Sequence, residues 1–442
     1  MPAVPTMRCG RSPGSAHRLC PYSITSFMNP CPKTTMYGNV LVSRCREISY
    51  QEGQRSLLVP EYARHGATAR AVAPCRSRRG NTMPTRSKAA VLVEPNAPLV
   101  IDDVTFPDPQ PDQVLIKLFA SGICHSQLHQ IHRTPQTAHR GTPAVYPSLL
   151  GHEATGVVVA RGHQVTHVQE GDHVMTTWVD RGAVEGAPPR ALVHVQWHGQ
   201  AVPAGPATWT EYTLLSERLV VPLDQEVATD VTSIVGCAVL TGAGVILNTL
   251  GVRVNESVAV FGAGGVGLCA IAAAHIVGAY PIIAVDLSDD KLAFAQRFGA
   301  THGVNAAHGD PVQAIQALTD GGVDYAIDAI GAARTQEQIL YAARPGAIGL
   351  KKGGTACLVG AVQELGRIDV EELRITQRTY TGTRGSLCRP DRDFPTFVRW
   401  YKRGQLDLDA LVTQRYTLEQ INDAVADLSG GRIHGRSIIM YA

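Results

Sequence analysis

The stretch Val258-Ala259-Val260-Phe261-Gly262-Ala263-Gly264-Gly265-Val266-Gly267 decides the fold of this 442-residue chain. Its four apolar residues predict a buried strand, and the apolar run 266–277 predicts a helix directly after the glycines. Glycines at this junction let the backbone approach a pyrophosphate, which the first amides of the helix can bind. A tight turn in an unrelated α/β sheet is the alternative interpretation, but the position between strand and helix favours a dinucleotide.

An acidic residue closes the next predicted strand, which runs over residues 281–285 and ends at Asp286. A carboxylate at this point accepts hydrogen bonds from the adenosine ribose and repels a 2′-phosphate. We therefore expect NAD rather than NADP as the cofactor.

Strands and helices alternate after this point. The pattern predicts helices over 290–298 and 336–343 and strands over 323–327 and 356–359. Such alternation is typical of a doubly wound parallel sheet, the Rossmann arrangement. Beyond Gly382 it breaks down into helices over 394–403 and 418–428 and a final strand over 437–441, a tail that can return to the first domain.

The region before the glycine turn has a different pattern. Short β runs separated by Pro and Gly predict a partly open barrel, with strands over 89–93, 114–118, 156–159, 173–177 and 212–215. We predict an α/β protein with a barrel domain (83–238 with 384–442) and a Rossmann domain (239–383).

Three residues of the barrel region are candidate metal ligands: Cys124, His152 and Cys237. Two sulfurs and one imidazole suit Zn²⁺, and three protein ligands leave a fourth tetrahedral position open for a substrate oxygen. Taken singly, each would more often be a buried core thiol or a hydrogen-bonded histidine. Cys269, Cys357 and Cys388 match no ligand motif and are expected in the core.

Composition excludes several classes of function. A formal net charge of +2 is too small to indicate a nucleic acid or an anionic membrane surface as partner. No apolar run is long enough to span a bilayer. The ten cysteines are widely scattered, unlike a secreted disulfide framework, so we expect a reducing, cytoplasmic compartment.

Residues 1–82 are unlike the rest of the chain. They hold twelve Lys or Arg against three acids, without a sustained hydrophobic period. We predict a disordered leader or a start assigned too early, with Met83 as the working start. A mitochondrial transit peptide is the alternative.

Several motifs together resemble the zinc-dependent medium-chain alcohol dehydrogenases. They occur in that family's order and approximate spacing from about Lys88 to the C-terminus, and they are Gly122-Ile123-Cys124-His125-Ser126-Gln127-Leu128-His129, Gly151-His152-Glu153, Gly236-Cys237 with Thr241, and the glycine turn. The resemblance implies a GroES-like catalytic domain interrupted by the Rossmann domain, with one catalytic zinc on Cys124, His152 and Cys237.

The resemblance also implies roles for neighbouring residues. Zinc would lower the pKa of the substrate alcohol, whose carbon passes a hydride to NAD. Ser126 would take the proton from the alcohol oxygen, and His129 would receive it through the cofactor ribose. Glu153, next to a ligand, joins them as a candidate catalytic residue. Trp178 resembles a large residue that walls the substrate pocket.

Further residues resemble the family's cofactor contacts. His125 lies where relatives carry a basic residue near the pyrophosphate, and Lys291 resembles a lysine at the adenosine ribose. The full set of expected cofactor-binding residues is His125, Thr241, Gly262, Gly264, Gly265, Val266, Gly267, Asp286, Lys291 and Val359.

Two departures from the family pattern have consequences. No cysteine lies between Cys124 and Cys237, where many relatives bind a second, structural zinc near positions 175–205, so we expect one zinc per chain and a lobe held by packing. Gln127 stands where relatives commonly have an aspartate that orients the zinc histidine. Its amide oxygen is expected to accept the imidazole N–H while leaving the metal more electrophilic.

Two other functions use the same motifs. A dehydrogenase of a thiol adduct of formaldehyde, or of a polyol, would share them all and differ only in its substrate pocket. A non-catalytic protein on this fold would be expected to lack a ligand or relay residue, and none is missing. The expected partners are a small alcohol or aldehyde and further copies of the chain, in a dimer or tetramer.

Overall fold

The computed structural model describes residues 84–132, 145–182, 186, 190–362 and 364–442, and of the preceding segment only two short strands. Contacts divide the chain into residues 1–78 and 79–442. In the first unit β1 (Cys45–Glu47) pairs antiparallel with β2 (Leu58–Pro60). The rest of the predicted leader lies outside the described residues.

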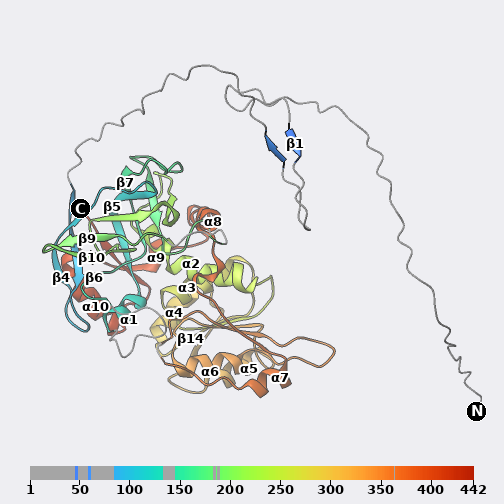
Figure 1. The fold of residues 1–442 in the computed structure, drawn as a ribbon. Helices are drawn as coiled ribbons and strands as arrows, with labels where there is room; N and C mark the ends of the chain where they lie inside the picture. The colour runs from blue at the N-terminus through green and yellow to red at the C-terminus, as the bar shows by residue number, and fades with distance from the viewer. Residues whose placement is uncertain are drawn as a thin grey trace, which may run out of the picture. The chain divides into compact units, whose positions relative to one another are not determined.

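Two largely antiparallel sheets form the barrel region (Figure 1). The first has the order β10-β9-β4-β3-β6, and the second β12-β8-β7-β5-β20-β19 with β11 also on β5. An isolated bridge between Ala89 and Thr210 links the first sheet to the approach to β11. The strands are β3 (Thr85–Leu92), β4 (Val100–Phe106), β5 (Gln113–Ile123), β6 (Ser148–Leu149), β7 (Ala154–Arg161), β8 (His173–Thr176), β9 (His194–Trp197), β10 (Gln200–Pro203), β11 (Tyr212–Ser216), β12 (Val220–Pro222), β19 (Val412–Tyr416) and β20 (Arg436–Met440).

The segment expected to form a lobe without a structural zinc contributes β9 and β10 to the first sheet. Val193, Val195 and Val202 are buried there in one apolar cluster with Phe106 of β4. Residues 183–185 and 187–189 lie outside the described residues.

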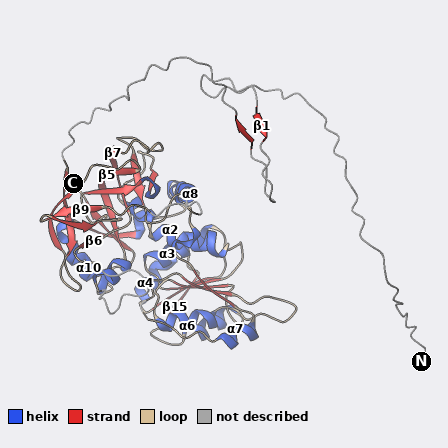
Figure 2. Ribbon diagram, viewed as in Figure 1, coloured by secondary structure: helices blue, strands red, loops and turns tan. Residues whose placement is uncertain are grey.

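A six-stranded parallel sheet forms the second region, in the order β15-β14-β13-β16-β17-β18. Helices cover both of its faces (Figure 2), which confirms the predicted doubly wound arrangement. The strands are β13 (Val258–Phe261), β14 (Ile282–Asp286), β15 (His302–Asn305), β16 (Tyr325–Asp328), β17 (Thr355–Leu358) and β18 (Thr379–Gly382).

The α-helices are α1 (His125–Ile131), α2 (Ala238–Gly244), α3 (Gly265–Ile276), α4 (Asp289–Arg297), α5 (Pro311–Thr319), α6 (Ala333–Ala342), α7 (Val370–Thr376), α8 (Pro390–Lys402), α9 (Leu408–Leu411) and α10 (Ile421–Ser429). Shorter or irregular helical turns are η1 (Glu217–Leu219), η2 (Val231–Gly236), η3 (Val245–Leu250), η4 (Gly385–Leu387) and η5 (Leu418–Gln420). No helix in the described ranges is long and apolar enough to cross a membrane.

The C-terminal tail returns to the barrel region as predicted. β20 pairs antiparallel with β5 along Ser437–Ile123 to Met440–Ala120. The first strand of the tail, β19, was not predicted; it runs parallel to β20. The return matters for the site because β5 ends one residue before Cys124, so the last strand of the chain lies beside a predicted ligand.

Helices α2 and α3 join the two regions in one apolar core. Val239, Leu240, Leu268 and Ile271 are fully buried in it, with Phe394 of α8. A side chain at Gly242 would run into the backbone carbonyl of Val266, so the two helices approach closely. Because Cys237 directly precedes α2 and the glycine turn precedes α3, this contact sets the predicted metal ligand beside the predicted dinucleotide turn. The exact boundaries of the two domains stay predictions.

Candidate active site

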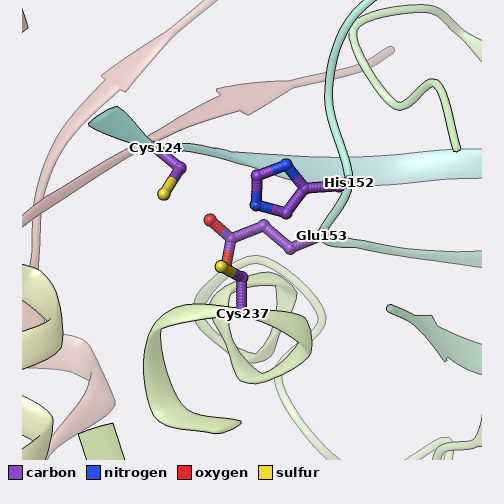
Figure 3. Close-up of side chains that lie close together, drawn as sticks. All are labelled: Cys124, His152, Glu153 and Cys237. Carbon is purple, nitrogen blue, oxygen red and sulfur yellow. The ribbon is translucent and has the colours of Figure 1, made fainter. Parts of the chain in front are cut away.

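Three different elements bring the predicted metal ligands together. Cys124 follows β5, His152 lies just before β7, and Cys237 lies between η2 and α2. Their ligand atoms, with a carboxylate oxygen of Glu153, all lie within 4.8 Å of one another. Figure 3 shows the Glu153 carboxylate pointing toward the two sulfurs and a His152 ring nitrogen. No other group of three such side chains was found in the described parts of the chain.

Glycines make this convergence sterically possible. A side chain at Gly122 would overlap the Glu153 carboxylate, and one at Gly236 would overlap the Thr176 carbonyl. Gly151 has a φ of +98°, the left-handed region that favours glycine. A larger residue at any of these three glycine positions would clash with a neighbour or strain the backbone beside a predicted ligand.

The two cysteine side chains have opposite pKa shifts. Hydrogen bonding from Cys237 to the Cys124 sulfur lowers the pKa of Cys124 and raises that of Cys237. Burial opposes thiolate formation at Cys237, and a cation bound beside the two sulfurs would favour it. This donor set, two sulfurs and an imidazole, fits Zn²⁺. Its binding would release protons from the ligand side chains.

Glu153 lies within the cluster, and its carboxylate also has partners in the protein. Its Oε1 pairs with Arg436, and its Oε2 accepts a hydrogen bond from the Ala238 N–H at 3.1 Å. Glu153 is fully buried, and burial raises its pKa, although Arg436 opposes that effect. Each carboxylate oxygen thus has a protein partner, which fixes the Glu153 side chain beside the other three residues.

Arg436 is a site residue that the sequence reasoning missed. It begins β20, is 4% exposed, and its Cδ lies 2.9 Å from where a Cβ at Gly265 would be. Arg436 therefore contacts both Glu153, through the ion pair, and Gly265 of the glycine turn. The sequence offers only one hint of this role: Arg436 is a basic residue directly before the apolar strand predicted over 437–441. The observed strand begins one position earlier, at Arg436 itself.

The Gln127 amide differs from its predicted geometry. Its oxygen accepts from the Cys124 backbone N–H at 2.8 Å, so its nitrogen faces His152 Nδ1. The expectation that the amide oxygen accepts the imidazole N–H is therefore wrong, because the backbone has taken that oxygen. An Nδ1 that accepts leaves the imidazole proton on Nε2, the nitrogen that faces the sulfurs (Figure 3).

Replacing Gln127 by glutamate is expected to tighten zinc binding about 10-fold or more, the usual size of effects from such supporting partners. The isosteric carboxylate has two accepting oxygens, one for the Cys124 N–H and one for a proton on His152 Nδ1, which frees Nε2. Zinc affinity measured by competition with a chelator checks this. Gln127→Leu, which removes both contacts, should bind zinc more weakly than the unchanged protein, and equal affinities for all three would contradict the assignment.

The predicted relay residues lie on α1. Ser126 and His129 are three residues apart, so they share one side of the helix. The Ser126 hydroxyl is buried without a hydrogen-bond partner in the described structure. Burial lowers the pKa of His129, although Cys124 opposes the shift. A free buried hydroxyl beside a histidine that is neutral at pH 7 suits proton transfer.

The glycine turn has the geometry of a dinucleotide site. Gly262 has a φ of +99°, and a side chain at Gly267 would clash with the Gly262 carbonyl. The turn opens α3, and Gly265, Val266 and Gly267 form its first turn. Their amides have no partner within the helix and can bind a phosphate.

Asp286 lies at the end of β14, beside the turn. Its Oδ2 accepts from the Ala263 N–H at 2.9 Å, and its Oδ1 accepts from the Leu287 N–H at 2.8 Å. Lys291 lies in α4, five residues further on. Thr241 lies in α2, and Val359 directly follows β17 with its N–H on the Asp328 carbonyl at 2.9 Å.

His125 begins α1 and is exposed. Even so, its low-dielectric surroundings lower its pKa; Cys124 opposes the shift, and the charges of Arg436 and Lys291 add to it. Arg436 and Lys291 are therefore close enough to His125 for their charges to affect its pKa. Basic groups from three separate elements around a glycine turn suit an anionic cofactor.

Trp178 lies beside the cluster. Its ring meets the His152 ring edge-on, with 6.5 Å between centroids. The structure therefore places the predicted pocket residue in contact with a predicted metal ligand.

Comparison with known proteins gives consistent matches. The zinc-binding dehydrogenase family pattern matches residues 265–403, and the alcohol dehydrogenase GroES-like domain pattern matches residues 110–225. An alcohol dehydrogenase class-3 of Cereibacter sphaeroides is 30% identical in an alignment of 388 positions that covers 80% of this chain and all of the relative. An S-(hydroxymethyl)glutathione dehydrogenase of Paracoccus denitrificans is 29% identical, with the same coverage.

Solved structures agree with the sequence matches. The benzyl alcohol dehydrogenase of Acinetobacter calcoaceticus superposes with a TM-score of 0.70 at 30% identity, covering 81% of this chain and all of that one. A zinc-binding alcohol dehydrogenase domain protein of Burkholderia ambifaria gives 0.71 at 31% identity, with the same coverage.

Proposed function

The chain belongs to the zinc-dependent medium-chain alcohol dehydrogenase family and is an oxidoreductase, and from this premise we propose that it oxidises an alcohol reversibly to an aldehyde or ketone with NAD as hydride acceptor. The observation that carries the proposal is the cluster of Cys124, His152 and Cys237, because three such ligands are the set that lets a catalytic zinc accept a substrate oxygen. A closed, four-ligand site would be structural instead.

The proposed metal site is built from those three residues. Zinc held there would supply Lewis acidity to an adjacent alcohol oxygen, and bound NAD would accept the hydride. Glu153 and Arg436 support the site, because their buried ion pair connects β20 to the residue next to His152. One zinc per chain is proposed.

NAD is proposed as the cofactor. The glycine turn and the start of α3 would bind its pyrophosphate, with His125 nearby and with Lys291 and Arg436 as cations that act on His125. Asp286 lies where it would repel a 2′-phosphate. Its Oδ2 is already bound to the turn through the Ala263 N–H, which fixes the carboxylate beside the proposed ribose site.

The proton is proposed to leave along α1. Ser126, whose buried hydroxyl has no partner in the described structure, would accept the alcohol proton, and His129 would pass it to solvent. A histidine acts as a base only when it is neutral. The lowered pKa of His129 keeps it neutral at pH 7, and alcohol oxidation should fall as the pH drops through that pKa.

His129→Gln is expected to slow alcohol oxidation by roughly 10²-fold at neutral pH, the lower end of what a positioned base supplies. Zinc should stay bound, because His129 is not among the clustered ligand residues. The defect should shrink at higher pH, where hydroxide or buffer accepts the proton. Rates measured from pH 6 to 10, with zinc content as control, check this; a defect that is equal at every pH would make His129 structural.

A second candidate substrate is a thiol adduct of formaldehyde. It is favoured by the similarity to an S-(hydroxymethyl)glutathione dehydrogenase. A polyol is the third class, without a specific observation in its favour.

One screen tests the proposed function. Primary alcohols, secondary alcohols, polyols and thiol–formaldehyde adducts are offered with NAD and with NADP, and reduced cofactor is followed by absorbance. We expect turnover with NAD and much less with NADP. No turnover of any class by the zinc-loaded protein would overturn the proposal.

A homo-oligomer, a dimer or tetramer, is also proposed. The segment between α6 and β17 exposes Ile348 and Leu350 by 87% and 90%. Large apolar side chains this exposed are more typical of a surface that another copy covers. The neighbouring β18 is the edge of the parallel sheet in the described structure, where a second chain can add a strand.

A further inference from the structure

An arginine stacks on the tryptophan beside the candidate metal ligands. Trp178 meets His152 edge-on on one side. The guanidinium carbon of Arg384 lies 5.4 Å from the Trp178 ring centroid. Arg384 comes from the loop after β18, in the parallel-sheet region, whereas Trp178 follows β8 in the barrel region. The two regions therefore place a cation close to the metal cluster, with one indole ring between them.

The loop that carries Arg384 is held in a defined conformation. Gly385, Ser386 and Leu387 have φ angles of 70°, 53° and 51°, a left-handed run that is unfavourable for the two non-glycine residues. The Ser386 hydroxyl donates to the Thr241 carbonyl at 2.7 Å. A Cβ at Gly385 would come within 3.3 Å of the Trp178 ring. The backbone next to Arg384 thus packs directly against the indole.

Both stacked groups lack an acceptor. Arg384 is exposed and forms no ion pair or hydrogen bond within the described residues. Nearby arginines do have acids: Arg190 pairs with Asp180, and Arg389 lies 3.9 Å from Asp391. The Trp178 indole Nε1–H is buried without a partner in the same part of the structure. An exposed guanidinium without a protein partner, stacked on an indole whose buried N–H also has none, suits an anionic ligand.

We propose that Arg384 is a specificity-determining residue that binds a carboxylate at the far end of the substrate. The inference rests on the proposed function and deepens it: the substrate class becomes alcohols and aldehydes that carry a carboxylate, such as ω-hydroxy acids. The planar guanidinium can bind both carboxylate oxygens, the apolar part of the substrate would lie against the Trp178 ring, and the hydroxyl would reach the metal cluster.

The cofactor is the alternative ligand that Arg384 could bind. Arg436 already lies against Gly265 of the glycine turn, and Arg436 and Lys291 both act on the pKa of His125. Arg384 instead lies against the proposed pocket wall, which favours the substrate. The experiment separates these two roles.

Matched substrate pairs test the proposal. The zinc-loaded, full-length enzyme is assayed with 6-hydroxyhexanoate against 1-hexanol, and with 4-hydroxybutanoate against 1-butanol. We expect kcat/KM to favour a hydroxy acid over its neutral partner. Arg384→Leu should lower kcat/KM for that hydroxy acid by about 10- to 10²-fold, the range for a charge-assisted hydrogen-bonded pair, and leave the neutral alcohol unchanged. Arg384→Lys should restore part of the loss.

A nearby arginine provides the control. Arg389→Leu removes the same charge five residues away, from a side chain whose acidic neighbour is Asp391, and should leave the preference intact. Equal efficiencies for acid and alcohol in the unchanged enzyme, or an equal loss for both in Arg384→Leu, would overturn the proposal. So would a defect in Arg384→Leu confined to the KM for NAD.

A binding measurement separates this proposal from the proposed function. Hexanoate binding is measured by calorimetry on the same proteins. Weaker binding to Arg384→Leu than to Arg389→Leu supports the carboxylate site even when no alcohol is oxidised, in which case only the dehydrogenase proposal fails. Hexanoate binding that is absent, or unchanged by Arg384→Leu, overturns the site whatever the activity.

Discussion

Replacing Cys237 by alanine is expected to abolish both zinc binding and alcohol oxidation. The remaining two ligands, Cys124 and His152, cannot hold an open tetrahedral site securely. The loss should be complete within detection, because the Lewis acid itself is gone. Metal content by elemental analysis and NADH formation on the same sample measure it.

Cys357→Ala is the matched control. Cys357 is also a fully buried cysteine, but it lies on β17 and is not one of the clustered ligand residues. This variant should keep its zinc and its turnover. Retention of full zinc and activity by Cys237→Ala would show that the cluster is not the metal site.

Arg436→Met is expected to destabilise the protein by about 3–5 kcal/mol, the usual cost of leaving one partner of a buried ion pair without compensation. Glu153 is fully buried, so its carboxylate would keep only the Ala238 N–H as a partner. The free energy of unfolding from urea titrations, without cofactor present, measures the effect. Combining Arg436→Met with Glu153→Leu should recover much of the loss, since both charges are then removed.

An exposed pair provides the comparison. Arg374 and Glu371 form an ion pair with side chains 72% and 59% exposed. Arg374→Met should cost at most about 1 kcal/mol, because solvent screens exposed pairs. A cost for Arg436→Met no larger than this would mean that Arg436 does not compensate Glu153 in the folded protein.

The parallel-sheet region was predictable because its sequence signals are local. The apolar run Val258–Phe261 is β13 as predicted, and the helix expected over 266–277 is α3 to within one residue at each end. The barrel region was harder. Five of its strands before the glycine turn were predicted (β3, β5, β7, β8 and β11), but β4, β6, β9, β10 and β12 were not, because strand formation depends on the partners and burial of a segment more than on its own residues.

In the candidate site, too, the residues in local motifs were predictable and those defined by distant partners were not. Cys124, His152 and Cys237 were predictable because each lies in a short motif. Arg436 was not, since its partner Glu153 is 283 positions away and only the return of β20 brings them together. The direction of the Gln127 amide depends on the Cys124 backbone N–H, which no sequence pattern reports.

Metal removal and return is the most direct test of the central claim that this cluster is a catalytic zinc site. The full chain is stripped with a chelator, and NADH formation is followed while zinc is added back with a substrate identified in the screen. We expect no turnover without metal and activity that rises linearly to a plateau at one zinc per chain. Undiminished turnover by the stripped protein, or full zinc uptake without any return of activity, would contradict the claim.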